Sequence, residues 1–405
     1  RQLKLRSDGV DGAKLLLYGE AWEFGSLEAK HPGNAFFQTR AGGTGLGVFN
    51  DRMRDALRGG TTNSKEKSDP GFLTGLYYDF NHDPSNKNTP IDSWGQREKI
   101  LHLGDVIKIG LAGNLKKFEF YDFKKNWISA QSHFFRGAPT PLALTPEETI
   151  NYISAHDGYS IWDSIQAKLP FQLDSRFPNT ASEEERVRSL RLGLAIVTLS
   201  QGIPFFENGG ELLRSRSGDQ DGYNSGDWFN RIDFTFNSNN WGVGLPPHWK
   251  NIDDWYFWRP RLANTELHPS KESILDTARY FFALLNIRRS SPLFRLPSYS
   301  QIQKTLSFPW DDQTQEYVPG VIAMSLDNKE PYKTKDLKNQ RLIVFFNATN
   351  SKQRYQLNNL KNKNLSLPPE FTEAIDSRLR TAHFDSLTGT FDLPERTTVI
   401  FQEKL

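Results

Sequence analysis

The sequence has no cysteine among its 405 residues and only two methionines. The absence of cysteine excludes a disulfide framework, a thiolate site for zinc or an iron–sulfur cluster, and a cysteine nucleophile. No apolar run reaches the length of about 18 residues that a membrane-spanning helix needs. Lys and Arg number 50 against 48 Asp and Glu, a net charge of +2, which argues against a nucleic-acid binder that depends on a basic surface.

Three common catalytic motifs are also absent. No G-x-x-x-x-G-K-[ST], H-E-x-x-H or G-x-S-x-G occurs in the sequence, which removes the simplest indications of a P-loop NTPase, a zinc protease and an α/β-hydrolase. Aromatic residues, by contrast, make up 13% of the chain and include ten Trp. So many flat apolar rings in a polar chain indicate either large cores or surfaces that stack on a flat ligand.

The first part of the chain alternates short apolar runs with amphipathic helices. The runs predicted as buried strands are 15–19, 45–49, 150–155 and 203–206. The predicted helices are 52–57, 183–200 and 272–288. The polar stretch 59–95 is predicted as surface loops. Alternating strands and helices indicate a parallel sheet whose functional loops follow the carboxyl ends of the strands, as in a (β/α) barrel.

The pattern changes after Pro292, where short β-rich runs separated by turn residues begin. These runs are 302–308, 321–326, 341–346 and 397–402. They predict a small antiparallel sandwich, and the Lys- and Asn-rich stretch 351–364 is predicted as a solvated loop within it. The predicted domains are therefore residues 1–296, with the barrel-like part, and residues 297–405, with the sandwich.

Polar residues directly follow two of the predicted strands. Glu20, with Trp22 close by, follows one strand, and His156 and Asp157 follow another. A carboxyl group beside a Trp has its neutral form favoured by desolvation, which suits a general acid near neutral pH. An Asp oriented by a His can hold substrate hydroxyls or a developing positive charge. Each pair alone has a simpler interpretation, as an ion-paired carboxylate or a hydrogen-bonded loop start.

The loop after the run 203–206 is dense in Arg, Asp, Asn, Tyr and Trp. Within residues 211–228 these are Arg214, Arg216, Asp219, Asp221, Tyr223, Asn224, Asp227 and Trp228. Planar donors, acceptors and aromatic faces at the mouth of a barrel suit a sugar, which has many hydroxyls and an apolar ring face. A solvated loop is the simpler interpretation, but such loops rarely expose Trp and Tyr.

Several segments carry a family resemblance when they are taken together and in order. They are Y-G-E-A-W (18–22), F-N-D-R-M-R-D (49–55), N-Y-I-S-A-H-D (151–157), S-Q-G-I-P-F-F (200–206), E-L-L-R-S (211–215), N-S-G-D-W-F-N (224–230) and S-S-P-L-F (290–294). This series resembles the pullulanase and limit dextrinase family, the starch-debranching enzymes of the α-amylase clan. The resemblance implies the C-terminal half of a (β/α)8 TIM barrel, strands five to eight, followed by an antiparallel β-sandwich.

The activity implied by the resemblance is hydrolysis of α-1,6-glucosidic branch linkages in pullulan, limit dextrins, and amylopectin or glycogen, with retention at the anomeric carbon. Glu20 matches the family's acid/base and Asp157 its transition-state stabiliser. The residues expected to bind substrate are Trp22, His156, Arg214, Asp221, Asp227 and Trp228. The family's nucleophile is an aspartate in an Arg-x-Asp motif that ends the fourth strand. No apolar strand with such an end occurs in residues 1–14, so the nucleophile is expected in a missing N-terminal half.

Two alternatives stay open. A catalytically inactive glucan-binding or scaffold relative would keep the sugar-binding residues without the nucleophile. An isoamylase or an α-1,4-acting amylase is disfavoured by the segment 224–230. The sequence also departs from the family pattern at the rim of the cleft. Ala21 and Glu23 stand where the family usually has Gly and Asp, Gly158 stands where it has Asn, and Gly222 where Ser is usual. Residues 207–210 are E-N-G-G where His-Ala-Gly-Asp is commoner.

The resemblance further implies an α-glucan or branched oligosaccharide as the partner, and neither nucleic acid nor membrane. It implies no required cofactor. Relatives frequently bind a structural calcium ion, although no carboxylate-rich loop with metal-ligand spacing stands out in this sequence. The compartment stays open because plastid, cytosolic and secreted members exist, with plastid or cytoplasm favoured.

Overall fold

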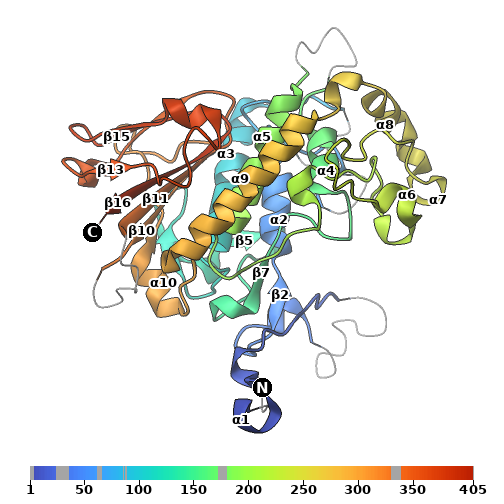
Figure 1. Cartoon of the computed structure of the whole chain (residues 1–405). Helices are drawn as coiled ribbons and strands as arrows, with labels where there is room; N and C mark the ends of the chain where they lie inside the picture. Colours follow the sequence, from blue (N-terminus) through green and yellow to red (C-terminus); the bar gives the residue numbers. More distant parts are fainter. Residues whose placement is uncertain are drawn as a thin grey trace.

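The computed structural model describes residues 4–23, 36–61, 66–84, 86, 89–171, 180–329 and 339–404 (Figure 1). Its helices are α1 (Leu5–Asp8), α2 (Asp51–Arg58), α3 (Ser93–Leu111), α4 (Ile161–Lys168), α5 (Glu183–Thr198), α6 (Gly226–Asn230), α7 (His248–Asn251), α8 (Trp255–Leu262), α9 (Lys271–Ser290) and α10 (Tyr299–Thr305). Its strands are β1 (Tyr18–Gly19), β2 (Gly47–Phe49), β3 (Glu119–Tyr121), β4 (Trp127–Ser129), β5 (Phe134–Phe135), β6 (Ala138–Pro139), β7 (Thr149–Asn151), β8 (Ile203–Pro204), β9 (Leu306–Ser307), β10 (Val321–Asp327), β11 (Asn339–Asn347), β12 (Gln353–Gln356), β13 (Leu365–Ser366), β14 (His383–Asp385), β15 (Thr390–Leu393) and β16 (Thr397–Lys404).

A four-stranded parallel sheet carries the first part of the fold. Its strand order is β1-β2-β7-β8, and each neighbouring pair is parallel. Three of the four strands fall within the apolar runs that predicted them, and β7 begins one residue before its run. Each strand is shorter than predicted. Because the strands are parallel, their carboxyl ends meet at one edge of the sheet, where the loops that follow them come together.

Strand β1 is an exposed edge of this sheet. Leu15, Leu16, Leu17 and Tyr18 are 38–53% exposed. The central strands β2 and β7 are buried throughout. In Figure 1, β2 and the N-terminal α1 extend from one end of the molecule, away from the C-terminal sheets. A run of apolar side chains on an unpaired strand edge is a surface that proteins normally cover.

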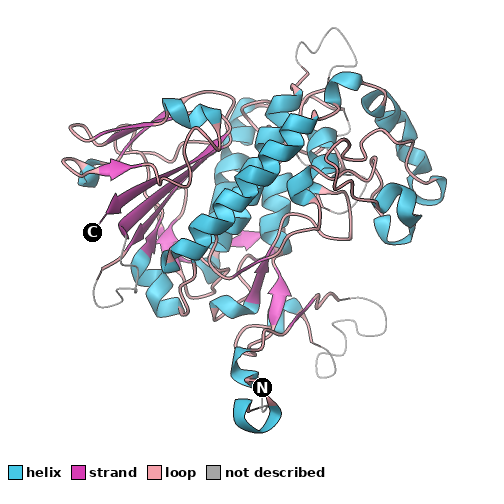
Figure 2. Ribbon diagram, in the orientation of Figure 1, coloured by secondary structure: helices cyan, strands magenta, loops and turns pink. Residues whose placement is uncertain are grey.

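Helices α5 and α9 pack side by side in the centre of the molecule (Figure 2). Helix α5 begins with a capping box in which Ser182 and Glu185 satisfy each other's backbone donors. The predicted helices over 52–57, 183–200 and 272–288 are confirmed as α2, α5 and α9. Their buried faces join one core that continues into the sandwich.

Three sequence predictions are wrong. The stretch 59–95 does not lie wholly on the surface, because Phe72, Leu73 and Leu76 are buried. The run 302–308 is mainly the helix α10, which begins where the Ser298 side chain accepts a hydrogen bond from the backbone N–H of Gln301. The supposed loop 351–364 contains β12 and β13 lies just after it. Helix α3, which begins at the N-cap Asp92, was not predicted.

The C-terminal part is an antiparallel β-sandwich, as the sequence predicts. One sheet has the order β13-β16-β11-β10-β9 and the other β12-β15-β14. Aromatic rings join the two sheets: Phe345 of the first lies 4.7 Å from Phe391 and 5.4 Å from Tyr355 of the second, between ring centroids. Strands β11 and β16 are buried almost throughout, because one face meets the second sheet and the other meets the helical layer.

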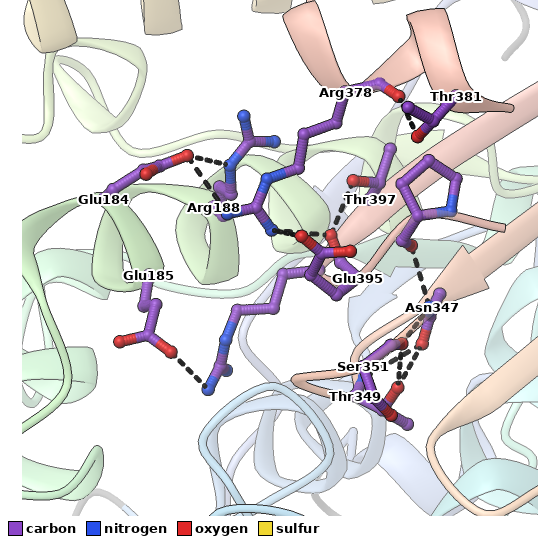
Figure 3. Close-up of polar contacts among 12 residues, drawn as sticks. Glu184, Glu185, Arg188, Asn347, Thr349, Ser351, Arg378, Thr381, Glu395 and Thr397 are labelled. Atoms are coloured by element: carbon purple, nitrogen blue, oxygen red, sulfur yellow. Dashed lines mark hydrogen bonds and ion pairs between the residues drawn. The ribbon is translucent and has the colours of Figure 1, made fainter. Parts of the chain in front are cut away.

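Buried ion pairs fasten the sandwich to helix α5. Arg188 of α5 donates to the Asp376 carboxylate at 3.0 Å, and the two side chains are 5% and 3% exposed. The Glu184 carboxylate accepts hydrogen bonds from Arg188 at 2.8 Å and from Arg378 of the sandwich at 3.1 Å (Figure 3). The two parts therefore share both a core and a charge network.

Within the described part of the chain, the helices lack the combination of length and apolar character that crossing a membrane requires.

Candidate active site

Glu20 stands at the carboxyl end of β1. Its position is set by the pairing of β1 with β2, in which Tyr18 lies opposite Gly47. Ala21, the next residue, has a left-handed backbone with φ 55°. Such a φ favours glycine, so the Ala at this family-glycine position is a local strain. The turn after β1 therefore redirects the chain immediately behind the Glu20 carboxylate.

His156 and Asp157 follow β7 in the same sheet. The strand is held by Asn151, whose side-chain amide donates to the carbonyls of Gly110 and Gln201 and to the hydroxyl of Ser200, all at 3.0 Å. Gly158 then takes a left-handed backbone with φ 70°. Glycine and asparagine are the residues that best tolerate this conformation, which explains the exchange of the family's Asn for Gly here.

The structure brings Glu20, His156 and Asp157 together. Nε2 of His156 lies 2.8 Å from Oε1 of Glu20, and Nδ1 of His156 lies 3.2 Å from Oδ1 of Asp157. The imidazole thus bridges two carboxylates that are far apart in the sequence. The Glu20 side chain is 43% exposed, so Trp22 does not exclude water from it, contrary to the desolvation expected from the sequence.

A small cavity of about 20 Å³ lies beside these three residues, and Trp22 lines it. Arg54 and Tyr152, which the sequence analysis did not single out, also line it. Arg54 donates to the Tyr152 hydroxyl at 2.7 Å and to the Asp55 carboxylate at 2.7 Å. Burial raises the pKa of the Tyr152 phenol, so the hydroxyl stays protonated.

An adjoining cavity of about 570 Å³ shares Ala155 and His156 with the first and is lined by Arg214. Glu207, at a position where the family commonly has His, forms part of its wall. The Glu207 carboxylate lies 3.8 Å from the guanidinium of Arg214 and 3.6 Å from that of Arg216. One Glu207 oxygen is buried with no hydrogen-bond partner in the described part of the chain.

Arg216 holds the loop that carries His156 and Asp157. Its guanidinium donates to the backbone carbonyls of His156 at 2.8 Å, Gly158 at 2.7 Å and Ala155 at 3.3 Å. The Arg216 side chain is 2% exposed. A buried, planar fork that binds three carbonyls within residues 155–158 fixes the direction of this loop. The sequence signal for Arg216 was only its place in the loop dense in Arg and Asp.

Asp163 holds the backbone of Arg216, and Gly222 leaves space for its side chain. The Asp163 carboxylate accepts from the backbone N–H of Arg216 at 2.8 Å and from the hydroxyl of Ser215. Burial raises the pKa of Asp163 to about 6, although these hydrogen bonds lower it. A Cβ on Gly222 would lie 2.6 Å from a guanidinium nitrogen of Arg216. The Gly at this family-serine position therefore leaves room for the Arg216 side chain.

The other predicted ligand-binding residues do not line either cavity. The Asp221 carboxylate pairs with Lys250 at 2.9 Å. Asp227 and Trp228 lie on α6 and are exposed, and the Trp228 indole donates to the carbonyl of Val243 at 3.1 Å. Their roles in substrate binding stay predictions.

Among the described residues, none is identified as the predicted nucleophile or as part of the predicted calcium site. Arg6-Ser7-Asp8 has the spacing Arg-x-Asp, but it lies in the short helix α1 and not at a strand end. In the part of the chain that the structure describes, no group of three or more His, Asp or Glu side chains is arranged to hold a metal ion. A structural calcium ion stays a prediction.

Comparisons with known proteins identify relatives of this chain. The family model for "Alpha-1,6-glucosidases, pullulanase-type, C-terminal" matches residues 236–404. The chain is 39% identical over 407 residues to "Pullulanase 1, chloroplastic" of Arabidopsis thaliana, covering 99% of this chain and 40% of that protein. It is 29% identical to a pullulanase of Klebsiella pneumoniae, covering 96% of this chain and 34% of that one.

Solved structures of pullulanases share the fold of this chain. PulA from Klebsiella oxytoca superposes with a TM-score of 0.84 at 27% identity, over 97% of this chain and 35% of that one. The maltotriose complex of PulA from Klebsiella pneumoniae superposes with a TM-score of 0.83 at 27% identity, over 97% of this chain and 40% of that one. The chain spans about 40% or less of the length of these relatives. The chain belongs to the pullulanase family.

Proposed function

We propose that this chain forms part of a retaining hydrolase that cleaves α-1,6-glucosidic branch linkages in pullulan, limit dextrins, and amylopectin or glycogen. The observation that supports this most is the contact of Glu20, His156 and Asp157 at the carboxyl edge of the parallel sheet. These are the residues that the family resemblance selects as acid/base, sugar ligand and transition-state stabiliser. They follow two different strands, β1 and β7, and catalytic residues of barrel enzymes likewise come from several strands.

In this proposal, Glu20 performs both proton transfers. Its carboxyl group first protonates the oxygen of the leaving glucan, and its carboxylate then removes a proton from the water that attacks the glycosyl-enzyme. The hydrogen bond from His156 to Glu20 has to be exchanged for one to the leaving oxygen when substrate enters. Asp157, 54% exposed in the open site, faces the same space and stabilises the positive charge of the transition state.

The proposed nucleophile is an aspartate from polypeptide outside this sequence, in a strand of the same (β/α)8 barrel. The exposed apolar residues of β1 support this, because an adjoining strand would cover them. On this proposal, residues 1–296 are the C-terminal half of the barrel and residues 297–405 are the sandwich. The nucleophile has to approach Glu20 to about 5–5.5 Å for retention.

The proposed substrate follows from the cavities and from the relatives. Klebsiella PulA has been crystallised with maltotriose. In this chain, the cavity wall of arginines, Glu207 and Tyr223 offers charged and planar groups to sugar hydroxyls and ring faces. No step of the proposed mechanism uses a cofactor or calcium.

The proposal is tested by incubating pullulan with the complete enzyme and analysing the products. Release of maltotriose, the unit between successive α-1,6 linkages, supports debranching. Binding of pullulan without release supports the alternative, an inactive glucan-binding relative. Release of products with newly cut α-1,4 linkages would show that the assignment to branch linkages is wrong.

A further inference from the structure

A separate cleft of about 450 Å³ lies where the first part of the fold meets the sandwich. It shares no lining residue with either cavity of the candidate active site. One wall is the β3–β4 hairpin, and the others are α10, β9 and loops of the sandwich. The hairpin follows α3 and precedes β7, so it lies on the side where the parallel strands begin. Glu20 and Asp157 lie where those strands end.

Six aromatic residues line this cleft, which we term the aromatic cleft, and three of them are not buried: Tyr121, Trp127 and Trp310. Tyr121 and Trp127 are directly opposite each other in the hairpin, with ring centroids 4.8 Å apart, and Tyr121 lies 5.2 Å from Trp310. Tyr121 is 41% exposed and Trp127 is 54% exposed. Leaving such large rings in water forgoes the free energy of their burial, which a ligand that stacks on them would recover.

The aromatic cleft is held rigid by hydrogen bonds that do not involve its exposed rings. The Tyr317 hydroxyl donates to the carbonyl of Tyr121 at 3.1 Å and lies 3.0 Å from that of Phe308. Gln303 of α10 accepts from the backbone N–H of Glu119 at 2.8 Å and donates to its carbonyl at 3.0 Å. A preformed cleft loses little conformational entropy when a ligand enters, which favours binding.

Polar side chains surround the rings. Lys304 and Asn359 line the cleft and are exposed, and neither side chain forms a hydrogen bond with another described residue. Asp312 also lines it, and one of its carboxylate oxygens accepts from the backbone N–H of Asn358 at 2.6 Å. Mixed donors and acceptors around aromatic faces match a sugar, whereas the acidic side chains disfavour a phosphate-bearing ligand.

We propose that the aromatic cleft binds a run of glucose units of an α-glucan, at a position remote from the candidate active site. The choice of an α-glucan rests on the proposed function, since the polymer that reaches this surface is the substrate. Its binding here holds the polymer on the enzyme between cleavage events. The effective concentration of branches near Glu20 is thereby raised without any contact at the site of cleavage.

The test measures the retardation of the complete enzyme in gels that contain glycogen. All variants carry His156→Ala, so that the candidate active site contributes little to binding. We expect Trp127→Ala to raise the dissociation constant about tenfold, equivalent to about 1.4 kcal/mol. Trp127→Phe, which keeps an aromatic face, should retain most of the binding. Trp94→Ala is the matched control, because Trp94 is 67% exposed and does not line the cleft.

If Trp127→Ala binds glycogen as tightly as Trp94→Ala does, the proposal that the aromatic cleft binds glucan is wrong. A pullulan digest of the unsubstituted enzyme separates this result from the proposed function. If the unsubstituted enzyme releases maltotriose and glycogen binding is unchanged in Trp127→Ala, only the proposal of glucan binding in the aromatic cleft is rejected. If glycogen binding is weakened in Trp127→Ala but the unsubstituted enzyme releases no maltotriose, glucan binding in the aromatic cleft is supported and the proposed debranching activity is rejected.

Discussion

The β-sandwich and the four-stranded parallel sheet of this chain differ in how completely their strands are covered by other elements. In the sandwich, β11 and β16 lie between two layers and are buried almost to their ends. In the parallel sheet, the strands are two or three residues long and β1 is exposed at one edge. The sandwich is thus stabilised by its own residues and by α5. The parallel sheet, which carries Glu20 and Asp157, leaves apolar surface for another segment to cover.

This difference indicates that the residues that stabilise the fold and the residues of the candidate active site lie in different sheets. Residues of the sandwich meet aromatic or apolar neighbours, such as Phe345 against Phe391. Residues of the candidate site are charged, partly exposed and held from behind by Arg216 and Asp163. Substitutions in the sandwich should therefore change stability, and substitutions at the carboxyl edge of the parallel sheet should change turnover.

The largest effect is expected for Glu20→Gln. Removing the general acid/base should lower turnover of pullulan by the complete enzyme about 10²- to 10⁴-fold, while dextrin binding stays nearly unchanged. Steady-state kinetics and calorimetry measure the two quantities. Glu98→Gln is the matched control, because Glu98 is exposed on α3 and lines neither cavity of the candidate site. Near-normal turnover in Glu20→Gln would remove the acid/base assignment.

Next in size is the effect of Arg188→Met on stability. The substitution leaves the buried Asp376 carboxylate without its partner, so the free energy of unfolding should fall by about 3–5 kcal/mol. Denaturant unfolding measures this loss. Arg354→Met is the control, since its pair with Asp392 is 71% and 48% exposed and should contribute at most about 1 kcal/mol. Equal losses in the two variants would contradict the buried character of the joint between α5 and the sandwich.

Asp163 predicts a pH dependence of stability. Its pKa is about 6 in the folded chain and 3.8 as its ordinary value, so the folded state binds the proton more tightly. The free energy of unfolding should therefore fall as the pH rises from about 4 to about 6, by up to about 3 kcal/mol. Asp163→Asn should flatten this part of the profile. Asp276→Asn, on the surface of α9, should leave it intact; a profile unaffected by Asp163→Asn would show that another group causes it.

Arg216→Lys tests the support behind the site. A lysine keeps the charge beside Glu207, but its compact ammonium group cannot span the carbonyls that the planar guanidinium reaches, so the loop of His156 and Asp157 loosens. Because small displacements of catalytic groups are costly, kcat should fall about 10- to 100-fold, with a smaller change in KM. Arg259→Lys, at an exposed position, is the control. A change confined to KM would indicate that Arg216 contacts substrate and does not position the loop.

The sequence predicted the parts of this fold whose signals are local. Amphipathic periodicity located α5 and α9, and apolar runs located the parallel strands and the three long strands of the sandwich, β10, β11 and β16. Helix α3 was missed because its start lies in a polar stretch rich in loop-forming residues. The run 302–308 was misassigned because its apolar residues suit a strand as well as the helix α10 that Ser298 starts.

The candidate site was predictable only in part, for a similar reason. Glu20, His156 and Asp157 follow recognisable strands, and the parallel sheet brings them together. Arg216 and Tyr152 act through contacts with residues far away in the sequence, and no local pattern marks such contacts. The exposure of Glu20 likewise depends on what surrounds it in space, which the neighbouring Trp22 alone does not determine.

The most direct test of the account is to trap the glycosyl-enzyme in Glu20→Gln with α-maltotriosyl fluoride. Fluoride leaves without protonation, so the intermediate should form, but without the general base it should hydrolyse slowly and accumulate. Peptide mass spectrometry of the complete enzyme then locates the sugar. The account predicts a maltotriosyl ester on an aspartate outside these 405 residues. An ester on a carboxylate of this chain, or no ester at all, would contradict it.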